Sequence, residues 1–402
     1  MTTSPRSLPK VLLVHDYYLQ RGGEDFVFEE EGALLESKGC RVIRYSRSND
    51  RILEMGRLAL LRTVLGGEPA VSEIRQIVRR EKPDVVHFHN TFPLITPAAC
   101  RAAKEEGAAV VVTLHNYRRI CLNGLLFRSG RVCEDCAKRT VGWPGVLHAC
   151  YRHSRTASAV VAWLNARQRR RQIWERSVDR FIVLSEFSRR KLEEAGLDVS
   201  RMVVKPNHVQ AEGEPGPWPR EPFALFVGRL TTEKGVSILL KAWEGIGAKF
   251  SLKIAGEGPV GVDALVSGGG PAGVEWMGWK GPEDVRALMR ACSVLVVPST
   301  WYEICPRTIM EAFAVGTPVL ASRLGSMAEF VDDGRNGLLF EPGNPGDLAE
   351  KATRLLEHPE ECRRLGLQAR EDFLAKYTAD RNFDRLMQIY GMAMSARHSR
   401  LG

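Results

Sequence analysis

Short apolar runs alternate with amphipathic segments along this chain, and the alternation occurs twice. In the first half, the Val-, Ile- and Leu-rich runs include KVLLVHDYY, DVVHFHN and AAVVVTLHN, and a helix-like segment between them is EDFVFEEEGALLESKG. A Pro- and Gly-rich stretch, HVQAEGEPGPWPREP, follows, and a second series then runs from FALFVGRL to NGLLFEP. Strands that alternate with helices predict a parallel sheet with crossover helices. The chain therefore predicts two doubly wound α/β domains joined by a linker.

The length and composition agree with two soluble domains. At 402 residues the chain suits two or three domains of roughly 100 to 200 residues each. No apolar run approaches the roughly 20 residues of a membrane-spanning helix. The first residues, MTTSPRSLPK, carry no secretory signal pattern. We therefore expect a cytoplasmic protein.

The positive charge is concentrated in the first half. Residues 1–208 contain 35 Lys and Arg against 23 Asp and Glu, a net charge of +12, and residues 209–402 contain 22 against 25, a net charge of −3. A nucleic acid, an anionic membrane surface or an anionic substrate could each explain the basic half, and a solvated basic surface is the simplest alternative.

Residues suited to a phosphate-bearing ligand stand where the predicted strands end. Gly22 and Gly23 lie in the first strand-to-helix turn, where helix N–H groups can meet an anion, although such a pair is more often only a turn. Arg229 and Lys234 flank a loop that follows a buried strand and opens a helix. Two cations there can neutralise a diphosphate leaving group, and the alternative is two solvated surface cations.

Two carboxylates interrupt the buried pattern around WYEICPRTIMEA. Pro306 suits the first turn of a helix and Gly316 suits its end. Glu303 then lies in the loop at the end of a strand, and Glu311 lies about a turn and a half into the helix. Ionised carboxylates only accept hydrogen bonds, which suits paired hydroxyls of a sugar ring or a ribose. The alternative is a helix carboxylate and an incidental loop acid.

These motifs resemble a known enzyme family. Glu303 and Glu311, preceded by VPS and followed by EAFAVGTPVLAS, resemble the E-x7-E motif of retaining glycosyltransferases of family 4, which have the GT-B fold. The resemblance continues in GRLTTEKG, AGEGP and GSMAEFVDDGRNGLLFEPGNPGDLAEKA, and more loosely in RGGEDF, PDVVHFHN, TLHNY and IVLSEFSRRKL. It implies two Rossmann-like parallel-sheet domains that face a central cleft.

The resemblance also implies domain limits and an activity. The acceptor-side domain would span residues 1–208 with a Cys-rich insertion at 118–155, and the donor domain would span 209–372. Residues 373–402 would form a helix that returns to the first domain. A sugar would pass from a nucleotide sugar to a hydroxyl of a glycan or lipid-linked acceptor, with retention of configuration and without a catalytic cofactor or divalent cation, in cell-envelope or exopolysaccharide synthesis.

The roles of single residues follow from the same resemblance. Glu303 would bind donor-sugar hydroxyls, Glu311 the ribose, Arg229 and Lys234 the diphosphate, and His115 the sugar or phosphate near the reacting centre. The family often has Gly where Pro306 stands, and Pro lacks the N–H that would meet the donor. The other residues expected to bind the donor are Gly22, Gly23, Gly228, Gly256, Glu257, Gly258, Ile304, Cys305, Pro306 and Arg307.

Four of the nine cysteines are grouped within the insertion. Cys121, Cys133, Cys136 and Cys150 have the spacing C-x11-C-x2-C-x13-C, which contains the C-x2-C knuckle typical of tetrahedral zinc sites. Disulfides are uncommon in cytoplasmic proteins, so the choice lies between a structural zinc ion and free thiols. We expect structural zinc.

A basic stretch follows the cysteines. Residues 151–191 hold eleven Lys and Arg against three Asp and Glu. The segment AVVAWLNARQRRRQIWERSV predicts a basic amphipathic helix carrying Val160, Trp163, Leu164, Ile173 and Trp174. Such a helix can lie on an anionic membrane, here the inner face of the cytoplasmic membrane, or it can pack on its own domain with a charged outer face.

Two other functions are compatible with parts of the sequence. A zinc-containing nucleic-acid-binding protein would use the basic half and the knuckle, but it would leave the Glu303, Glu311, Arg229 and Lys234 set without a purpose, so we expect no nucleic-acid partner. A catalytically inactive regulator that binds nucleotide sugars would keep the donor residues. Hydrolysis and transfer assays distinguish that regulator from an enzyme.

Overall fold

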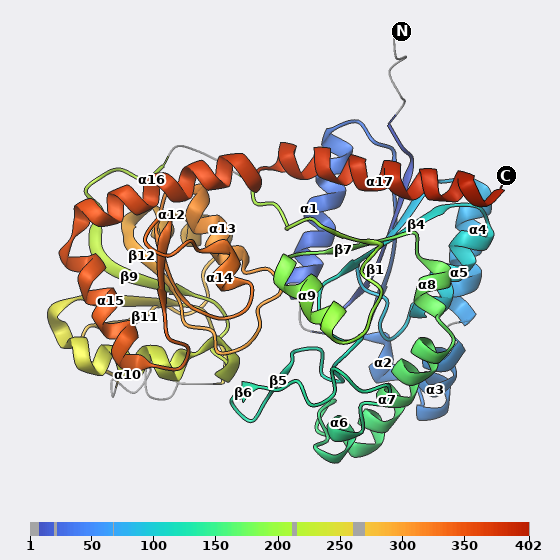
Figure 1. The fold of residues 1–402 in the computed structure, drawn as a ribbon, viewed down its shortest axis with the longest axis horizontal. Coiled ribbons are helices and arrows are strands. Elements are labelled where there is room, and N and C mark those ends of the chain that lie inside the picture. The colour runs from blue at the N-terminus through green and yellow to red at the C-terminus, as the bar shows by residue number, and fades with distance from the viewer. Residues whose placement is uncertain (1–7, 20–21, 67, 211–214, 260–269, 402) are drawn as a thin grey trace, which may run out of the picture.

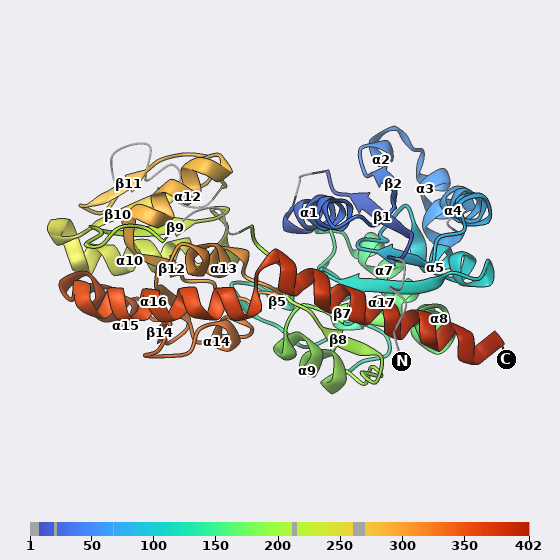
Figure 2. The same cartoon turned by 90° about the horizontal axis from the view of Figure 1, so that it is seen from above.

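The chain forms two α/β units that lie side by side. The computed structural model describes residues 8–19, 22–66, 68–210, 215–259 and 270–401. The last two long helices run one after the other along the same side of both units (Figures 1 and 2). Four residues of the predicted linker, 211–214, lie outside the described residues.

The first unit is built on a parallel sheet of six strands in the order β2-β1-β3-β4-β7-β8. The strand order reverses between β1 and β3. The loops that follow these two strands therefore lead in opposite directions at the carboxyl edge of the sheet. Ligands of doubly wound sheets bind at such a switch point. The strands are β1 (Val11–Tyr17), β2 (Val42–Ser48), β3 (Val85–Phe88), β4 (Ala109–Leu114), β7 (Arg180–Val183) and β8 (Met202–Val204).

The second unit has the strand order of a dinucleotide-binding fold. Its sheet is also parallel, in the order β11-β10-β9-β12-β13-β14, with the reversal between β9 and β12. The switch point therefore lies where β9 and β12 end. The strands are β9 (Glu221–Val227), β10 (Ser251–Ala255), β11 (Val274–Trp276), β12 (Cys292–Val297), β13 (Val319–Ser322) and β14 (Gly337–Phe340).

Helices cover the first sheet, and an insertion between β4 and β7 adds a two-stranded hairpin. The hairpin pairs β5 (Phe127–Arg128) with β6 (Arg131–Val132), and it extends toward the second unit (Figure 1). The helices are α1 (Gly23–Ser37), α2 (Arg51–Glu54), α3 (Arg57–Gly66), α4 (Glu68–Glu81), α5 (Thr96–Glu105), α6 (Trp143–Leu147), α7 (Arg155–Arg170), α8 (Ile173–Ser177) and α9 (Glu186–Glu194).

The helices of the second unit lead into one that returns to the first. The final helix, α17 (Ala379–Leu401), packs against α1, β3, β4 and β7, and its Leu386, Ile389 and Tyr390 belong to the core of the first unit. The others are the short 3-10 turns η1 (Thr232–Lys234) and η2 (Gly247–Lys249), and α10 (Val236–Ile246), α12 (Pro282–Ala291), α13 (Arg307–Ala314), α14 (Met327–Phe330), α15 (Pro345–Glu357) and α16 (Pro359–Lys376).

The expected amphipathic helix is two helices. α7 ends at Arg170, and Gln172 adopts a left-handed conformation with φ of 49° before α8 begins at Ile173. Leu164 and Trp174 are buried, because this side of the helices packs on the first unit. Trp163 alone among the five expected apolar residues is mostly exposed, at 51%.

Within the described residues, none of the helices combines the length and apolar character that crossing a membrane requires.

Candidate active site

The loops at the switch point of the second sheet bring a lysine and a buried glutamate together. Lys234 ends the 3-10 turn η1 after β9, and Glu303 lies in the loop after β12. Lys234 Nζ lies 2.7 Å from Glu303 Oε1, and Ser299 Oγ donates to the same oxygen at 2.8 Å. Burial opposes ionisation of Glu303, which is 6% exposed, but Lys234 and Ser299 hold its pKa below the ordinary value. The site therefore holds an ionised carboxylate against an ammonium group.

Arg229 and the glycines of the neighbouring turns lie on the same edge. Arg229 is exposed in the loop after β9. A Cβ atom on Gly256 would come within 1.9 Å of the Gly228 carbonyl oxygen, and one on Gly258 within 2.4 Å of that of Leu230. These glycines are thus required because the two loops pack backbone to backbone. The side chain of Glu257 between them is exposed.

Glu311, on α13, lies beside an arginine that connects the two units. Arg307 donates two hydrogen bonds of 2.8 Å to Glu30 on α1, and its Nη2 lies 3.5 Å from Glu311 Oε1. Burial raises the pKa of Glu311, although Arg307 acts in the opposite direction. The ion pair to Glu30 shows that the start of α13 contacts the first unit.

The loop between Glu303 and α13 is packed from both sides. Pro306 is the N-cap of α13, one residue before the helix, and Ser326 Oγ donates to the Glu303 carbonyl oxygen at 2.6 Å. Ile304 is buried and packs with the core of the first unit, and Cys305 lies against it. The Ile304 side chain is therefore occupied in packing, which leaves its backbone as the part that can meet a donor.

The first unit contributes His115, which follows β4. Its Nε2 lies 3.1 Å from His89 Nδ1, and the two rings are stacked with centroids 5.3 Å apart. Burial, and then the neighbouring His89, keep the pKa of His115 well below its usual value. The imidazole is consequently neutral at physiological pH.

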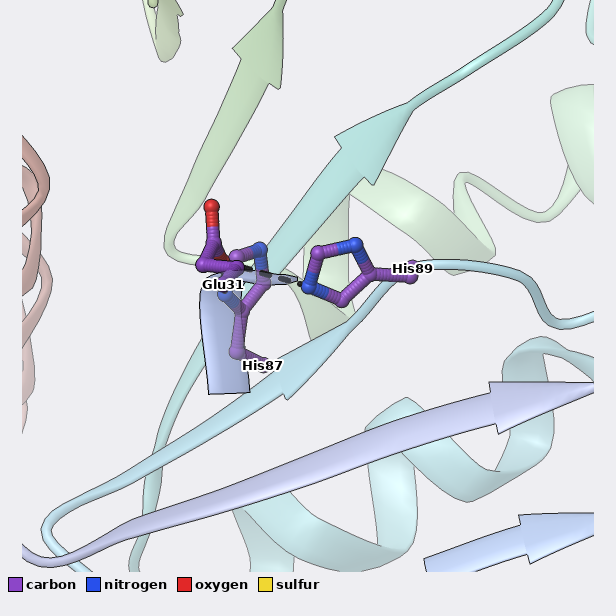
Figure 3. A group of neighbouring side chains, drawn as sticks. All are labelled: Glu31, His87 and His89. Carbon is purple, nitrogen blue, oxygen red and sulfur yellow. Dashed lines mark ion pairs between the residues drawn. The ribbon is translucent and has the colours of Figure 1, made fainter. Parts of the chain in front are cut away.

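A buried network behind His115 was not predicted from the sequence. Figure 3 shows Glu31 of α1 beside His87, which is in β3, and within reach of His89, the residue that follows β3. Glu31 Oε1 lies 3.0 Å from His87 Nδ1 and 3.2 Å from His89 Nε2, and Lys205 Nζ donates to Oε2 at 2.9 Å. The i, i+2 spacing of the histidines in HFHN placed both on one face of the strand.

This network has the spacing of a metal site but not its charge balance. The ligand atoms of Glu31, His87 and His89 all lie within 4.8 Å of one another. However, the Lys205 ammonium already neutralises the Glu31 carboxylate, and His87 Nδ1 lies 2.9 Å from the Tyr390 hydroxyl. A divalent cation would face this ammonium at close range. We therefore interpret the cluster as the support of His115: the carboxylate favours the proton on His89 Nε2, which leaves His89 Nδ1 to accept from His115.

The Gly22–Gly23 turn is closed by an acid that caps α1. Gly22 donates its N–H to Asp25 Oδ2 at 2.8 Å, and Asp25 Oδ1 lies 2.6 Å from His15 Nε2. A Cβ atom on Gly23 would meet nothing within 4 Å, so the turn is open at that residue. The next residue, Glu24, has a buried Oε1 atom without a hydrogen-bond partner, and burial raises its pKa to about 7.

A cavity of about 70 Å³ lies beside His115 in the first unit. It lies between the ends of β3 and β4 and the helices α7 and α8. Amide, guanidinium and aromatic groups line it together with the imidazole, as expected for a ligand that carries hydroxyl or anionic groups. Its polar lining includes Asn90, Asn116, Arg118, Arg119, Asn165 and Gln168.

The four predicted cysteines line one cavity of about 10 Å³ in the insertion. None of them forms a disulfide. The structure thus brings Cys121 and Cys150 to the C-x2-C pair across the hairpin.

Two six-stranded parallel sheets, with a final helix that returns from the second unit to the first, define a GT-B fold. Family models match residues 11–208, as a glycosyl transferase 4-like domain, and residues 211–372, as glycosyl transferases group 1. The chain belongs to the GT-B glycosyltransferases of family 4.

Similar proteins cover only part of the sequence. The uncharacterized glycosyltransferase MJ1178 of Methanocaldococcus jannaschii is 36% identical over 170 residues, 42% of this chain and 47% of that protein. The D-inositol 3-phosphate glycosyltransferase of Nocardia farcinica is 30% identical over 229 residues, 50% of each chain. The chain spans about half the length of these curated relatives.

Solved structures with the same fold cover nearly the whole chain. Sucrose-phosphate synthase of Thermosynechococcus elongatus has a TM-score of 0.71 at 19% identity, covering 96% of this chain and 100% of that one. Anabaena Alr3699/HepE in complex with UDP and glucose has a TM-score of 0.65 at 18% identity, covering 94% and 98%. At these identities the likeness concerns the fold.

Proposed function

We propose that this protein is a retaining glycosyltransferase that moves a sugar from a nucleotide sugar to a hydroxyl of a glycan or lipid-linked acceptor, in cell-envelope or exopolysaccharide synthesis. The observation that carries the proposal is the Lys234–Glu303 pair at the switch point of the second sheet. In this proposal residues 209–372 bind the donor and residues 1–208 bind the acceptor. Residues 373–402 connect the two by returning to the first domain.

Departure of the nucleoside diphosphate is the step that the cations would assist. The bond between the anomeric carbon and the phosphate oxygen breaks, and the acceptor oxygen bonds to the same face of that carbon. The acceptor proton passes to the departing phosphate oxygen. Lys234 has three N–H donors, so it can bind a phosphate oxygen and keep its contact with Glu303. Together with Arg229 it would neutralise the diphosphate, so we expect transfer to continue in a chelator.

Glu303 would orient the transferred sugar. Its carboxylate stays ionised because Lys234 and Ser299 lower its pKa, so it can accept hydrogen bonds from sugar hydroxyls. Glu311 would accept from the ribose hydroxyls, with Arg307 beside it as the group that limits its motion. The backbone of residues 304–306 would complete the donor site with one N–H fewer than in relatives with Gly in place of Pro306.

The acceptor would approach from the first domain. The neutral His115 ring can exchange a hydrogen bond with a sugar hydroxyl or a phosphate oxygen without adding charge. The cavity beside it offers amide and guanidinium groups to an acceptor that carries hydroxyl or anionic groups.

Structures with this fold support the choice of donor. Anabaena Alr3699/HepE has been solved with UDP and with UDP-glucose, and TarM of S. aureus has been solved with UDP. Each has a nucleoside diphosphate or a nucleotide sugar bound, as we propose here.

A panel of nucleotide sugars, tested for binding and for slow hydrolysis, examines the proposal. We expect Glu303→Ala to abolish transfer while the fold and nucleoside diphosphate binding persist, because the diphosphate is held by Arg229 and Lys234. Glu350→Ala, which removes an exposed carboxylate of α15, is the matched control and should behave as the wild type. Transfer by Glu303→Ala at the wild-type rate would refute the role of Glu303.

We also propose that the first domain rests on an anionic membrane through α6 and α7. Trp143 and Leu147 of α6 are 49% and 55% exposed, and Trp163 of α7 is 51% exposed. Arg139 lies over the Trp143 ring and Arg167 over the Trp163 ring, at 5.0 and 5.6 Å. Exposed Trp side chains beside Arg suit the boundary between lipid headgroups and acyl chains.

Flotation with vesicles tests this surface. We expect binding to vesicles rich in phosphatidylglycerol at low salt, and loss of binding in Trp143→Ala/Trp163→Ala. Trp279→Ala removes a tryptophan that is 68% exposed in the other domain and should bind as the wild type. Equal binding by all three proteins, or no binding by the wild type, would overturn the proposal.

A further inference from the structure

We propose that Cys121, Cys133, Cys136 and Cys150 hold one structural zinc ion, and that this ion fixes Glu134 as a latch between the two domains. We call the contacts of Glu134 with Lys191 and Tyr302 the Glu134 latch. Zinc binding is independent of the proposed function, whereas the effect of the latch on transfer rests on it.

The donor set has the composition of a structural zinc site. Four cysteines surround a cavity of about 10 Å³, which is the space of a single small occupant. The Cys121 thiol donates to Asn123 Oδ1 at 2.9 Å, and Cys136 Sγ lies 3.7 Å from the Gly142 carbonyl oxygen. Zinc would replace the thiol protons, because it binds the thiolate form. Four thiolates close the coordination shell, as in structural rather than catalytic sites.

Among the residues that the structure describes, the cysteines outside the insertion do not line a common cavity with one another. Cys40, Cys100, Cys292 and Cys362 are each buried among apolar side chains of the two domain cores. Within the described residues, the cysteines of the insertion are not among the groups whose ligand atoms all lie within 4.8 Å of one another. Zinc would therefore draw the sulfur atoms inward, and the insertion would become more rigid when it binds.

Glu134 lies inside the C-x2-C turn, so zinc would control its position directly. Its Oε1 accepts a hydrogen bond of 2.9 Å from the Tyr302 hydroxyl and lies 3.0 Å from Lys191 Nζ. Tyr302 belongs to the donor domain and immediately precedes Glu303. The latch therefore joins the insertion to the loop that carries the proposed sugar-binding carboxylate.

Aromatic packing makes the latch specific to this arrangement of the domains. The centroid of the Tyr302 ring lies 4.7 Å from that of Phe187, which is at the start of α9. Lys191 Nζ lies 5.6 Å from the Tyr302 centroid and 5.7 Å from the Phe187 centroid. A second contact is close by: Glu329 of α14 accepts from the N–H groups of Glu186 and Phe187 at 2.9 and 2.8 Å. Separation of the domains would break both contacts.

Metal analysis of the full-length chain tests the zinc site. We expect one zinc ion per chain, released by a mercurial that blocks thiols, and loss of zinc in Cys121→Ser and Cys136→Ser. Cys40→Ser should keep its zinc. A wild-type chain that contains no zinc after expression and incubation with zinc, and whose thiols all titrate freely, would overturn the site even if the Cys variants fail to fold.

A double-mutant cycle with Glu134→Ala and Tyr302→Phe tests the latch. Each single variant should keep its zinc and its thermal midpoint but raise the KM for the nucleotide sugar roughly 3- to 10-fold, the effect of one lost hydrogen bond. The double variant should resemble either single one, because both remove the same contact. Multiplying effects, or unchanged KM values, would overturn the latch. Absence of any transfer by the wild type would instead contradict the proposed function and leave the zinc result valid.

Discussion

Replacement of Lys234 by alanine should lower both the free energy of unfolding and the rate of transfer, and separate assays measure the two effects. Glu303 is 6% exposed and would retain the Ser299 hydroxyl but no cation beside its charge. Removal of one partner of a buried ion pair costs about 3 to 5 kcal/mol. We expect about 3 kcal/mol, because the Lys234 side chain is 24% exposed and water already weakens the pair. The pKa of Glu303, now held below its usual value by Lys234, should rise above it in the variant.

The sign of the pH effect follows from this change. In the wild type, the Glu303–Lys234 pair stabilises the fold above the ordinary carboxyl pKa, and that contribution is lost in acid. In Lys234→Ala the carboxylate destabilises the fold at pH 8, and protonation should restore stability as the pH falls toward 5. Chemical denaturation at both pH values measures the difference from the wild type, which should shrink at pH 5.

The double variant Lys234→Ala/Glu303→Gln supplies the control. It should recover most of the lost stability, because no charge is left buried without a partner. It should remain inactive in a nucleoside diphosphate release assay, since the contacts to phosphate and sugar are both absent, and the single Lys234→Ala variant should be slower by about 10²- to 10³-fold. A loss of stability that is equal at both pH values, or that is larger in the double variant, would refute this reasoning.

Other contacts give sharp expectations. Arg307→Met removes the two bonds to Glu30, so the radius of gyration from X-ray scattering should increase; an unchanged radius would contradict an interdomain role. Lys205→Met leaves Glu31 buried without a cation and should cost about 3 to 5 kcal/mol on denaturation; a loss below about 1 kcal/mol would count against it. Glu24 has a pKa of about 7 in the fold against an ordinary 4.5. The free energy of unfolding of the wild type should therefore fall as the pH rises from 4.5 to about 7, because the buried carboxyl must lose its proton. Glu24→Gln should lose less, and parallel melting curves from pH 4.5 to 8 would contradict this.

Much of the fold could be predicted because the central strands of both sheets are buried on both faces. Runs such as VLLVHDY and CSVLVV need no tertiary information to be recognised as parallel strands. The break after Arg170 could not be predicted, because the basic segment continues through it and only the left-handed Gln172 marks it. Packing of Leu164 and Trp174 on the first domain then decided which side of the helices stays exposed.

The residues proposed to bind the donor could be selected from the sequence more readily than the residues that contact them. The spacing of Glu303 and Glu311 and the position of Lys234 lie within short motifs. The pairing of Lys234 with Glu303 connects residues 69 positions apart, and the contact of Tyr302 with Glu134 connects residues 168 apart. Such contacts depend on strand order and on how the domains meet, which no local pattern contains. The same holds for Glu31, whose charge is apparent from the sequence but whose position beside His87 and His89 is not.

Release of nucleoside diphosphate from a panel of nucleotide sugars, followed in the presence of EDTA for the wild type and for Glu303→Ala, tests the proposed transferase. We predict that the wild type hydrolyses at least one nucleotide sugar slowly in the chelator, and that Glu303→Ala still binds the corresponding nucleoside diphosphate but does not release it from the sugar. A wild-type protein that binds none of the nucleotide sugars, or a Glu303→Ala variant as active as the wild type, would contradict the proposal.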